Sequence, residues 1–437
     1  MAEWISVQGT RTGVGKSTLV ASVCRELKSR GYSVAPFKPV NYSLNSFPVE
    51  GTEIGYMSNF QWKVAGADLS KDINPVLVKF IDDKAEVVTD KYEEVDVSNL
   101  NEFIKSKEEF ITRSAERLDR KYDCVVMEGY GSLVKSNLDY NFNSYFLKKF
   151  DPSTVLVGDS SLGGVEASLK GCLELVDKEV EETVDLLIVN KIHPDSKGKE
   201  KLRQEIKEKT SVETCLIEYK DRLNLPPEDS TPELKGSGEI TVIDYPNSSN
   251  SSDLWKLPEE KTAKASTPED IRNAELVILP GSKNVFQDLK WLREKEFDKA
   301  LEDADKILGI CGGLQILGEK IEGNSIEEGS TKGLGLIDLE TGYSNSKTLK
   351  QVETTVEGEK VQGYEIHYGD SKTELLKEEG LFYRSGDIIG TYVHDLLASE
   401  PFLNKVLKLS GLEKVETTGP GLNQLDEETE KILEAVT

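Results

Sequence analysis

Residues 306–317 read KILGICGGLQIL, a stretch that predicts a strand, a sharp turn and the start of a helix. An apolar run ends at Ile310, a single cysteine and two glycines follow, and apolar residues then resume at helical spacing. Gly309 and Gly313 allow a tight backbone that a Cβ atom would obstruct. Cys311 would stand at a helix N-terminus, where the helix dipole favours a thiolate. The pattern therefore predicts a nucleophile elbow built around Cys311.

A lone cysteine is more often a small buried hydrophobic residue than a nucleophile, but the flanking glycines favour the catalytic interpretation. Gly309, Cys311, Gly313 and Gln315 fit the pattern Gly-x-Cys-x-Gly-x-Gln and so resemble class I glutamine amidotransferases. We therefore expect Gln315 to help bind glutamine.

A cysteine nucleophile requires a base, and the chain contains three histidines. His394 lies in a β-rich segment that ends at a turn, so we expect it to be the base for Cys311. His367 is the alternative and is more typical of a substrate or interdomain contact. Backbone amides near Gly281 and Gly312 are expected to bind substrate and stabilise the oxyanion.

Residues 9–18 read GTRTGVGKST and lie between a strand-like apolar run and an amphipathic helical pattern. This is a phosphate-binding loop lengthened by one residue. Its amides would bind phosphates, Lys16 would reach the outer phosphates, and the Ser17 hydroxyl would ligate Mg²⁺. The loop predicts ATP and Mg²⁺ as cofactors. The residues expected to bind the nucleotide are Gly9, Thr10, Gly13, Gly15, Lys16, Ser17, Thr18 and, after a later strand, Asn190.

Two acidic residues are candidates for the same metal. Glu128 ends an apolar strand, as a Walker-B acid does, and is expected to be a metal ligand. Glu53 is either a Mg²⁺ ligand or a charge in the first turn of a helix, and the sequence leaves both open. A polar segment also follows the second expected strand, where open parallel sheets bind ligands. The substrate-binding residues expected there are Lys38, Asn41, Ser43 and Asn45.

Strands alternate with helices up to about residue 217, which predicts a doubly wound parallel α/β domain. A stretch with proline and glycine then marks a boundary, and a second α/β series begins at residue 239. We expect a P-loop domain at 1–225, a linker at 226–238 and a second α/β domain at 239–437.

The composition limits the function classes. The 437 residues carry a formal charge of -25, which argues against binding of nucleic acid or an anionic membrane. The five cysteines are widely spaced, as in reduced cytoplasmic proteins. No apolar run reaches the ~18 residues that span a bilayer. We expect a cytoplasmic protein with small-molecule partners.

The motifs and their order along the chain resemble those of the corrinoid amidotransferase family, which includes cobyric acid synthase and cobyrinic acid a,c-diamide synthase. The resemblance covers nearly the whole chain. SLNS at 43–46 and NPVL at 74–77 favour the cobyric acid branch. The resemblance implies a dethiobiotin-synthetase-like domain that makes amides with ATP and a class I glutamine amidotransferase-like domain. It also implies a metal set of Ser17, Glu53 and Glu128, and a glutaminase pair of Cys311 and His394. Leu396 stands where most class I enzymes carry a third, acidic residue, in keeping with the family.

The implied activity is ATP- and glutamine-dependent amidation of peripheral carboxylates of adenosylcobyrinic acid a,c-diamide, through an acyl phosphate and ammonia. The chain departs from the family after Glu128 and before Gly163, both on the acceptor side. Another acceptor (cobyrinic acid, another tetrapyrrole or a cell-wall carboxylate) therefore remains an alternative, and a homodimer is left open. A partition- or septum-type ATPase switch is the alternative of another class. Arg11, in place of a signature lysine, and the Cys311 segment argue against it.

Overall fold

The computed structural model spans residues 1–437 and describes residues 1–81, 84–134, 141–220, 223–228, 234–324, 329–414 and 421–436. The chain forms two compact units. The first unit comprises Met1–Ser43, Thr52–Leu225 and Gly419–Thr437. The second unit comprises Leu44–Gly51 and Pro226–Thr418.

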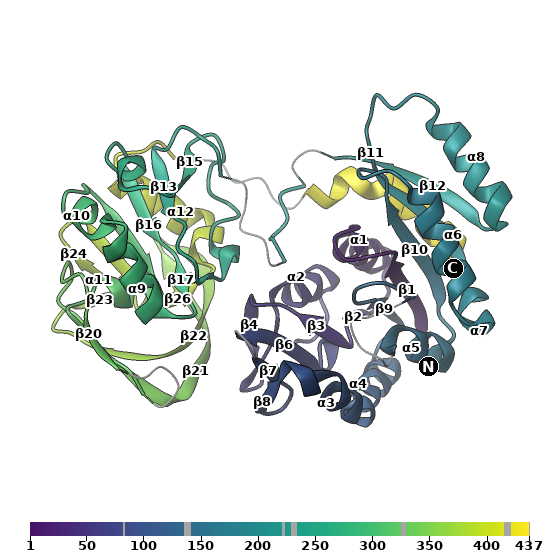
Figure 1. Cartoon of the computed structure of the whole chain (residues 1–437), viewed down its shortest axis with the longest axis horizontal. Coiled ribbons are helices and arrows are strands. Elements are labelled where there is room, and N and C mark those ends of the chain that lie inside the picture. The colour runs from purple at the N-terminus through teal and green to yellow at the C-terminus, as the bar shows by residue number, and fades with distance from the viewer. Residues whose placement is uncertain are drawn as a thin grey trace. The chain divides into compact units, whose positions relative to one another are not determined.

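A six-stranded parallel sheet forms the centre of the first unit (Figure 1). Its strands in spatial order are β12 (Glu213–Glu218), β11 (Val184–Ile192), β10 (Ser153–Asp159), β1 (Glu3–Gly9), β9 (Cys124–Glu128) and β2 (Val34–Phe37). Successive side chains of a strand point to opposite faces. Val155 and Val157 of β10 join a core with α1 (Lys16–Ser29), whereas Leu156 joins a core with α6 (Val165–Leu175). Helices on both faces confirm the predicted doubly wound α/β domain.

The other elements of the first unit surround this sheet. A smaller sheet has the order β3-β6-β7-β8, with β3 (Val40–Tyr42), β6 (Val76–Ile81), β7 (Lys84–Val88) and β8 (Tyr92–Asp96). The remaining helices are α2 (Tyr56–Ala65), α3 (Leu100–Ser106), α4 (Glu108–Lys121), α5 (Phe142–Phe150), α7 (Lys178–Glu181) and α8 (Lys199–Thr210), and β5 (Thr52–Gly55) precedes α2.

The helix α13 (Asp426–Val436), the last one among the described residues, belongs to the first unit. Ile432 and Leu433 are buried in the core that contains α1. Arg25 of α1 donates a 3.2 Å hydrogen bond to the carbonyl oxygen of Leu422, in the 3-10 helix η6 (Gly421–Leu425). This arrangement differs from the expected range 239–437 for the second domain, because the apolar face of α13 completes the first unit.

Two sheets form the second unit. The larger contains β15 (Thr262–Ala265), β13 (Ile240–Ile243), β16 (Leu276–Leu279), β18 (Ile307–Ile310), β25 (Ile388–Thr391), β24 (Phe382–Ser385) and β23 (Lys377–Glu378), in that order. Its first five strands are parallel, as expected for a second α/β series. The other contains β20 (Ser330–Lys332), β19 (Lys320–Glu322), β21 (Glu340–Val356), β22 (Glu359–Lys372) and β26 (Val393–His394). The second unit also contains a two-stranded pair, β14 (Ser248–Ser249) and β17 (Gly281–Ser282). Its helices include α9 (Val285–Glu294), α10 (Phe297–Glu302), α11 (Gly312–Leu317) and α12 (Glu400–Leu409).

Two short segments also differ from the expected domain ranges. Residues 44–51, with β4 (Ser46–Val49), pack on the second unit although the sequence on both sides belongs to the first. Residues 229–233 of the expected linker 226–238 lie outside the described residues. Beyond them, Leu234 is buried in the core of the second unit and Lys235 pairs with Ala263.

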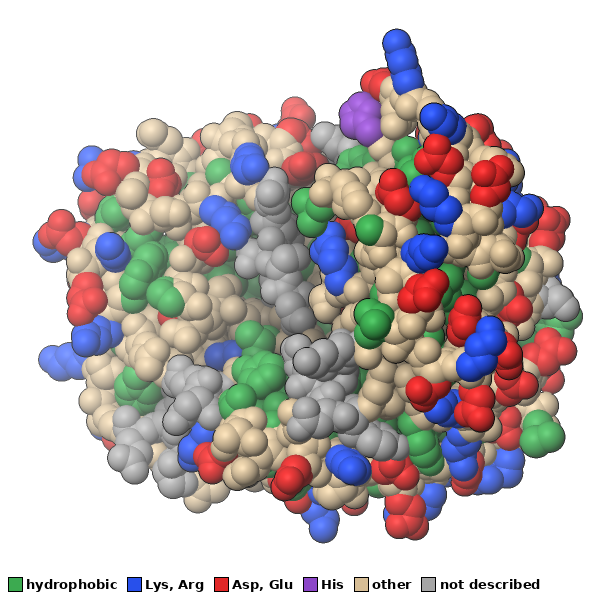
Figure 2. Space-filling view, turned by 45° about the vertical axis from the view of Figure 1, so that its right-hand side comes forward, with side chains coloured by type: hydrophobic (Ala, Val, Ile, Leu, Met, Phe, Trp, Pro, Cys, Tyr) green, Lys and Arg blue, Asp and Glu red, His purple; other side chains and the backbone are tan. Residues whose placement is uncertain are grey.

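The surface carries both signs of charge. Figure 2 shows acidic and basic side chains interspersed over one face, in keeping with 79 acidic and 54 basic residues. Within the part of the chain that the structure describes, no helix has the length and apolar character that crossing a membrane requires.

Candidate active sites

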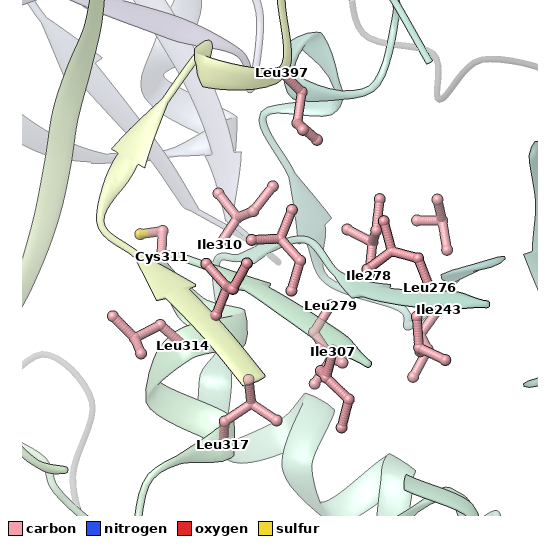
Figure 3. Close-up of a cluster of buried hydrophobic side chains, with 14 of the residues drawn as sticks. Ile243, Leu276, Ile278, Leu279, Ile307, Ile310, Cys311, Leu314, Leu317 and Leu397 are labelled. Carbon is pink, nitrogen blue, oxygen red and sulfur yellow. The ribbon is translucent and has the colours of Figure 1, made fainter. Parts of the chain in front are cut away.

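Cys311 lies in the turn between β18 and α11, as predicted, at the margin of a cluster of buried aliphatic side chains (Figure 3). Its backbone has φ 50° and ψ -103°, a strained conformation for a residue with a Cβ atom. The turn is held by a 2.7 Å hydrogen bond from the amide of Cys311 to the carbonyl oxygen of Thr391. The strain is that of a nucleophile elbow, which presents the side chain at the strand end.

The glycines around Cys311 permit close contacts between main chains. A Cβ atom on Gly312 would lie 2.7 Å from the amide nitrogen of Ser282, and one on Gly313 would lie 2.1 Å from the carbonyl oxygen of Leu279. A Cβ atom on Gly281 would lie 3.2 Å from Cε1 of His394. The structure thus brings the loops of Gly281 and Gly312 together beside the base.

His394 is buried at the end of β26 and bonds with an acid that the sequence did not identify. Its Nδ1 atom donates a 2.7 Å hydrogen bond to Oδ2 of Asp253, in the 3-10 helix η3 (Ser251–Asp253). The other oxygen of Asp253 accepts a 2.5 Å bond from the amide of Asp395. Nδ2 of Asn250 lies 3.2 Å from Nε2 of His394. Both edges of the imidazole ring are therefore fixed.

Charges near His394 change its pKa. Burial alone would lower the pKa, but the Asp253 carboxylate and the Cys311 side chain outweigh burial and raise it to about 10. A protonated imidazole beside a thiol stabilises the thiolate. Cys311, His394 and Asp253 therefore have the composition of a nucleophile, base and orienting acid.

Asp253 comes from a stretch far from the histidine in sequence. Leu396 occupies the position where most class I enzymes carry the acid of the catalytic triad. Asp253 instead precedes His394 by 141 residues. One weak signal was available: NSSNSSD at 247–253 is a polar run just after an expected strand.

The other residues predicted for the glutaminase site have different partners. Gln315 is 2% exposed, and its Oε1 atom accepts a 2.8 Å hydrogen bond from the hydroxyl of Tyr343. Its Nε2 atom donates a 3.4 Å bond to Tyr392. His367 stacks on Tyr392, with ring centroids 4.1 Å apart, and its Nε2 atom lies 3.5 Å from Glu365. The geometry assigns the contact with Asp253 to His394 and not to His367.

The phosphate-binding loop follows β1 at the carboxyl edge of the parallel sheet, where open sheets bind ligands. Thr10 donates a 2.9 Å bond to Val157, and Lys16 donates 3.1 Å bonds to the carbonyl oxygens of Arg11 and Gly131. Gly15 has φ 102°. These contacts fix the loop at the N-terminus of α1.

Asn190 and Lys191 hold the loop from β11, which β10 separates from β1 in the sheet. Asn190 Nδ2 donates a 2.8 Å bond to the carbonyl oxygen of Val14, and Lys191 Nζ donates a 2.7 Å bond to that of Gly13. Any side chain at Gly15 would clash with Asn190, since a Cβ atom there would lie 2.4 Å from Nδ2. A cavity of about 100 Å³ lies on this side of the loop. The lining includes Gly15, Thr18, Asn190, Tyr219 and Leu425.

Ser17 and Glu128, both predicted metal ligands, lie together. The Ser17 hydroxyl donates a 2.8 Å bond to Oε1 of Glu128, Lys38 Nζ lies 2.8 Å from the same oxygen, and Gln61 donates a 2.6 Å bond to Oε2. Burial alone would raise the pKa of Glu128, but Lys38, Gln61 and Lys16 hold it below its usual range. An ionised carboxylate beside a hydroxyl is an oxygen donor set suited to Mg²⁺.

Glu53, the third predicted ligand, has partners from the smaller sheet. Its carboxylate forms an ion pair with Lys79 and accepts a 2.9 Å hydrogen bond from Tyr92. It lies on β5, before the start of α2. These contacts place Glu53 in a structural ion pair, and its role as a metal ligand stays a prediction.

The polar segment after β2 is divided between the two units. Lys38, Asn41 and Ser43 belong to the first unit, and Asn45 belongs to the second, where its Nδ2 atom donates a 2.9 Å bond to Glu228. Asn41 is 1% exposed, and within the described residues neither polar atom of its side chain has a hydrogen-bond partner. Among these residues, Asn41 therefore has buried polar atoms that a ligand could satisfy.

Two family models match the chain. The CobQ/CobB/MinD/ParA nucleotide binding domain matches residues 5–232, and the CobB/CobQ-like glutamine amidotransferase domain matches residues 239–402. The first covers the phosphate-binding loop and Glu128, and the second covers Cys311, His394 and Asp253. Nucleotide use and a glutamine amidotransferase domain are thus supported independently of the geometry.

Relatives along nearly the whole chain give the same result. Cobyric acid synthase of Clostridium perfringens is 34% identical, over 94% of this chain and 92% of its own. Cobyric acid synthase of Halorhodospira halophila is 36% identical, over 93% of this chain and 89% of its own length. Probable cobyric acid synthase of Methanococcoides burtonii is 34% identical, over 96% of this chain and 92% of its own length. The chain therefore belongs to the cobyric acid synthase family and is a glutamine-dependent amidating ligase of cobalamin biosynthesis.

Proposed function

We propose that this protein amidates peripheral carboxylates of adenosylcobyrinic acid a,c-diamide to give adenosylcobyric acid, with ATP and glutamine as co-substrates. The observation that carries this proposal is the similarity to cobyric acid synthases over 94% of the chain, which includes both sites. The joined residues Cys311, His394 and Asp253 support the glutamine half of the reaction.

In that half, Cys311 Sγ attacks the side-chain carbonyl carbon of glutamine. Amides near Gly281 and Gly312 bind the oxyanion. His394 gives its proton to the leaving nitrogen, and ammonia departs. Water then attacks the thioester, His394 takes up its proton, and glutamate leaves. Asp253 keeps the imidazole oriented through both steps.

In the other half, Lys16 and the amides of the loop hold the phosphates of ATP. The acceptor carboxylate takes the γ-phosphoryl group and becomes an acyl phosphate. Ammonia attacks the acyl carbon, phosphate leaves, and an amide forms. The cavity beside Asn190 would take the nucleotide base, and Asn41 would bond with the acceptor.

The donor chemistry fits a magnesium ion. Ser17 and Glu128 would hold it, since their oxygen atoms already lie 2.8 Å apart. Bound there, Mg²⁺ would neutralise charge on the transferred phosphoryl group. Glu53 would join them only if its carboxylate left Lys79 and Tyr92.

The test uses the full chain with ATP, Mg²⁺ and glutamine, with and without adenosylcobyrinic acid a,c-diamide. Glutamate release is measured, and the corrinoid is followed by mass spectrometry. We expect stepwise mass gains of one amide each, with matching glutamate release. Glutamate release with an unchanged corrinoid mass would retain the amidotransferase and reject this acceptor.

A further inference from the structure

Residues 44–51 belong to the second unit, the glutaminase unit, which also carries Cys311, His394 and Asp253. All four side chains of β4 are buried, and Phe47 is 5% exposed. Asn45 bonds to Glu228, and Gln351 of β21 donates a 3.2 Å bond to the carbonyl oxygen of Pro48. The segment is thus held at two points, Asn45 and Pro48, by the second unit.

Phe47 begins a row of three rings that ends at the catalytic base. The ring of Phe47 meets that of Tyr364 edge to face, with centroids 5.0 Å apart and planes at 63°. The ring of Tyr364 stacks on His394, with centroids 5.3 Å apart and planes at 26°. Tyr364 and His394 are also direct partners in the pairing of β22 with β26. Tyr364 is fully buried, so its ring cannot move without moving its neighbours.

These contacts complete the fixation of the imidazole ring. Asp253 and Asn250 hold its two edges, and Tyr364 covers one face. Phe47 is the outer support of Tyr364. A small shift of Phe47 would change the tilt of Tyr364 and therefore the direction in which His394 points.

The same short segment is continuous with the expected acceptor site. Ser43 directly precedes it, Asn41 lies two residues before Ser43, and Thr52 separates its last residue from Glu53. Glu50 and Gly51, at its end, have φ 49° and φ 77°, a tight turn back to β5. Binding that changes residues 41–43 or Glu53 would pull on the chain that carries Phe47.

We propose that Phe47 is a positioning residue through which acceptor and ATP binding stimulate glutamine hydrolysis, by way of Tyr364 and His394. This inference rests on the proposed function, because it requires an acceptor bound near residues 41–53. The proposal gives a role to the packing of residues 44–51 on the second unit, although the residues before and after them in the chain belong to the first unit. Its consequence is that glutamine is hydrolysed mainly when an acceptor is present.

The experiment measures the stimulation of glutamine hydrolysis in the full-length protein. Glutamate release is recorded with glutamine alone, with MgATP, and with MgATP plus the corrinoid, and the ratio of stimulated to unstimulated rates is compared. Phe47→Leu keeps the apolar volume without the ring, and Phe47→Tyr keeps the ring. Val49→Ala is the matched control, because it removes buried volume from the same strand and leaves the rings in place. Synthesis with free ammonia is measured in parallel.

We expect Phe47→Leu to lower the stimulation ratio at least about fivefold, the lower range of allosteric coupling. Phe47→Tyr and Val49→Ala should keep the ratio, and ammonia-driven synthesis should persist in all variants. A merely structural role would lower stimulated and unstimulated rates together and leave the ratio unchanged, which would overturn the proposal. So would a wild-type rate that responds to neither MgATP nor the corrinoid. If ammonia and MgATP leave the corrinoid unchanged, the proposed acceptor fails, and the response to MgATP alone still decides the role of Phe47.

Discussion

The two sites differ in what holds their reactive groups. In the glutaminase site, Cys311 and Asp253 both interact with His394, and main-chain bonds fix the elements that carry them. In the nucleotide site, Lys38 and Ser17 bond to Glu128, and Lys16 bonds to carbonyl oxygens. Phosphate and metal would have to replace these bonds.

The difference reflects the chemistry of the two halves. A thiol nucleophile works when its base is already oriented, so the fold can complete that site by itself. Phosphoryl transfer depends on charges that must be offered to the substrate. Lys16 and Lys38, whose ammonium groups meet at the loop and at Glu128, can offer such charges. Variants that disable the ATP half should therefore keep the unstimulated rate of glutamine hydrolysis, and variants that disable the glutamine half should keep synthesis with free ammonia.

The largest effect is expected for Cys311→Ala. Without a nucleophile, glutamine-dependent amidation should fall by about 10⁴-fold or more. Synthesis with free ammonia should continue, because the nucleotide site is intact. Amide formation is measured with each nitrogen source, and Cys172→Ala is the control, since Cys172 is buried in the first unit. Loss of ammonia-driven synthesis would show that the two sites are not separable in this way.

The converse variant is Lys16→Met. Synthesis with ammonia should fall by about 10²- to 10³-fold, the usual cost of removing a group that stabilises transition-state charge. Glutamine hydrolysis without ATP should stay within about twofold, because Lys16 belongs to the first unit, whereas Cys311, His394 and Asp253 belong to the second. Lys28→Met is the control, because Lys28 lies on the same helix and is exposed. A large fall in hydrolysis without ATP would contradict the separation.

Asp253→Asn tests the residue that the sequence did not identify. The kcat for glutamine hydrolysis should fall by about 10²-fold, because the imidazole loses both its orientation and its charge partner. Ammonia-driven synthesis should be unaffected. Asp244→Asn, in the same unit, is the control, since Asp244 pairs with Lys264. An unchanged kcat would mean that Asp253 only supports the fold.

The same variant makes a prediction about pH. The pKa of His394 is raised to about 10, so its positive charge stabilises the folded state fully below about pH 6.5, the ordinary histidine value. That contribution is lost as the pH rises toward 10. Thermal unfolding at pH 6, 8 and 10 should show the wild type losing its advantage over Asp253→Asn as the pH rises. A difference that is constant across this range would remove Asp253 as the cause of the shift.

The smallest effect on chemistry, and a clear one on stability, is expected for Leu433→Ala in α13. Truncation of this fully buried side chain should cost about 2 to 4 kcal/mol of unfolding free energy. The loss should weaken the first unit and its ATP binding, and leave glutamine hydrolysis intact. Urea unfolding and nucleotide titration check this, with the exposed Glu434→Ala as control. Weakened hydrolysis with normal ATP binding would place α13 with the second unit.

The sequence predicted those strands, turns and loops whose conformation depends on residues close together in the chain. The apolar run 276–279 is β16, and the glycines beside Cys311 gave the elbow. The phosphate-binding loop was predicted because strand, loop and helix are contiguous. Ser17 and Glu128 lie within hydrogen-bond distance because β1, which leads into the loop, and β9 end at the same edge of the sheet, and their role as metal ligands stays a prediction.

The remainder depends on contacts between distant stretches. Asp253 reaches His394 across 141 residues, and no spacing rule connects them. Residues 44–51 contain the buried strand β4, and α13 has one buried apolar face. Their sequences indicate that they need a partner and do not specify which one.

The placement of α13 has a consequence for synthesis on the ribosome. Residues 44–51 and 226–414 emerge before residues 421–436, so the second unit has the chain that forms its core while the first unit still lacks α13. A nascent chain would hold the phosphate-binding loop on an incomplete core until α13 has been made. Cotranslational folding should thus delay ATP binding until both catalytic halves have been made.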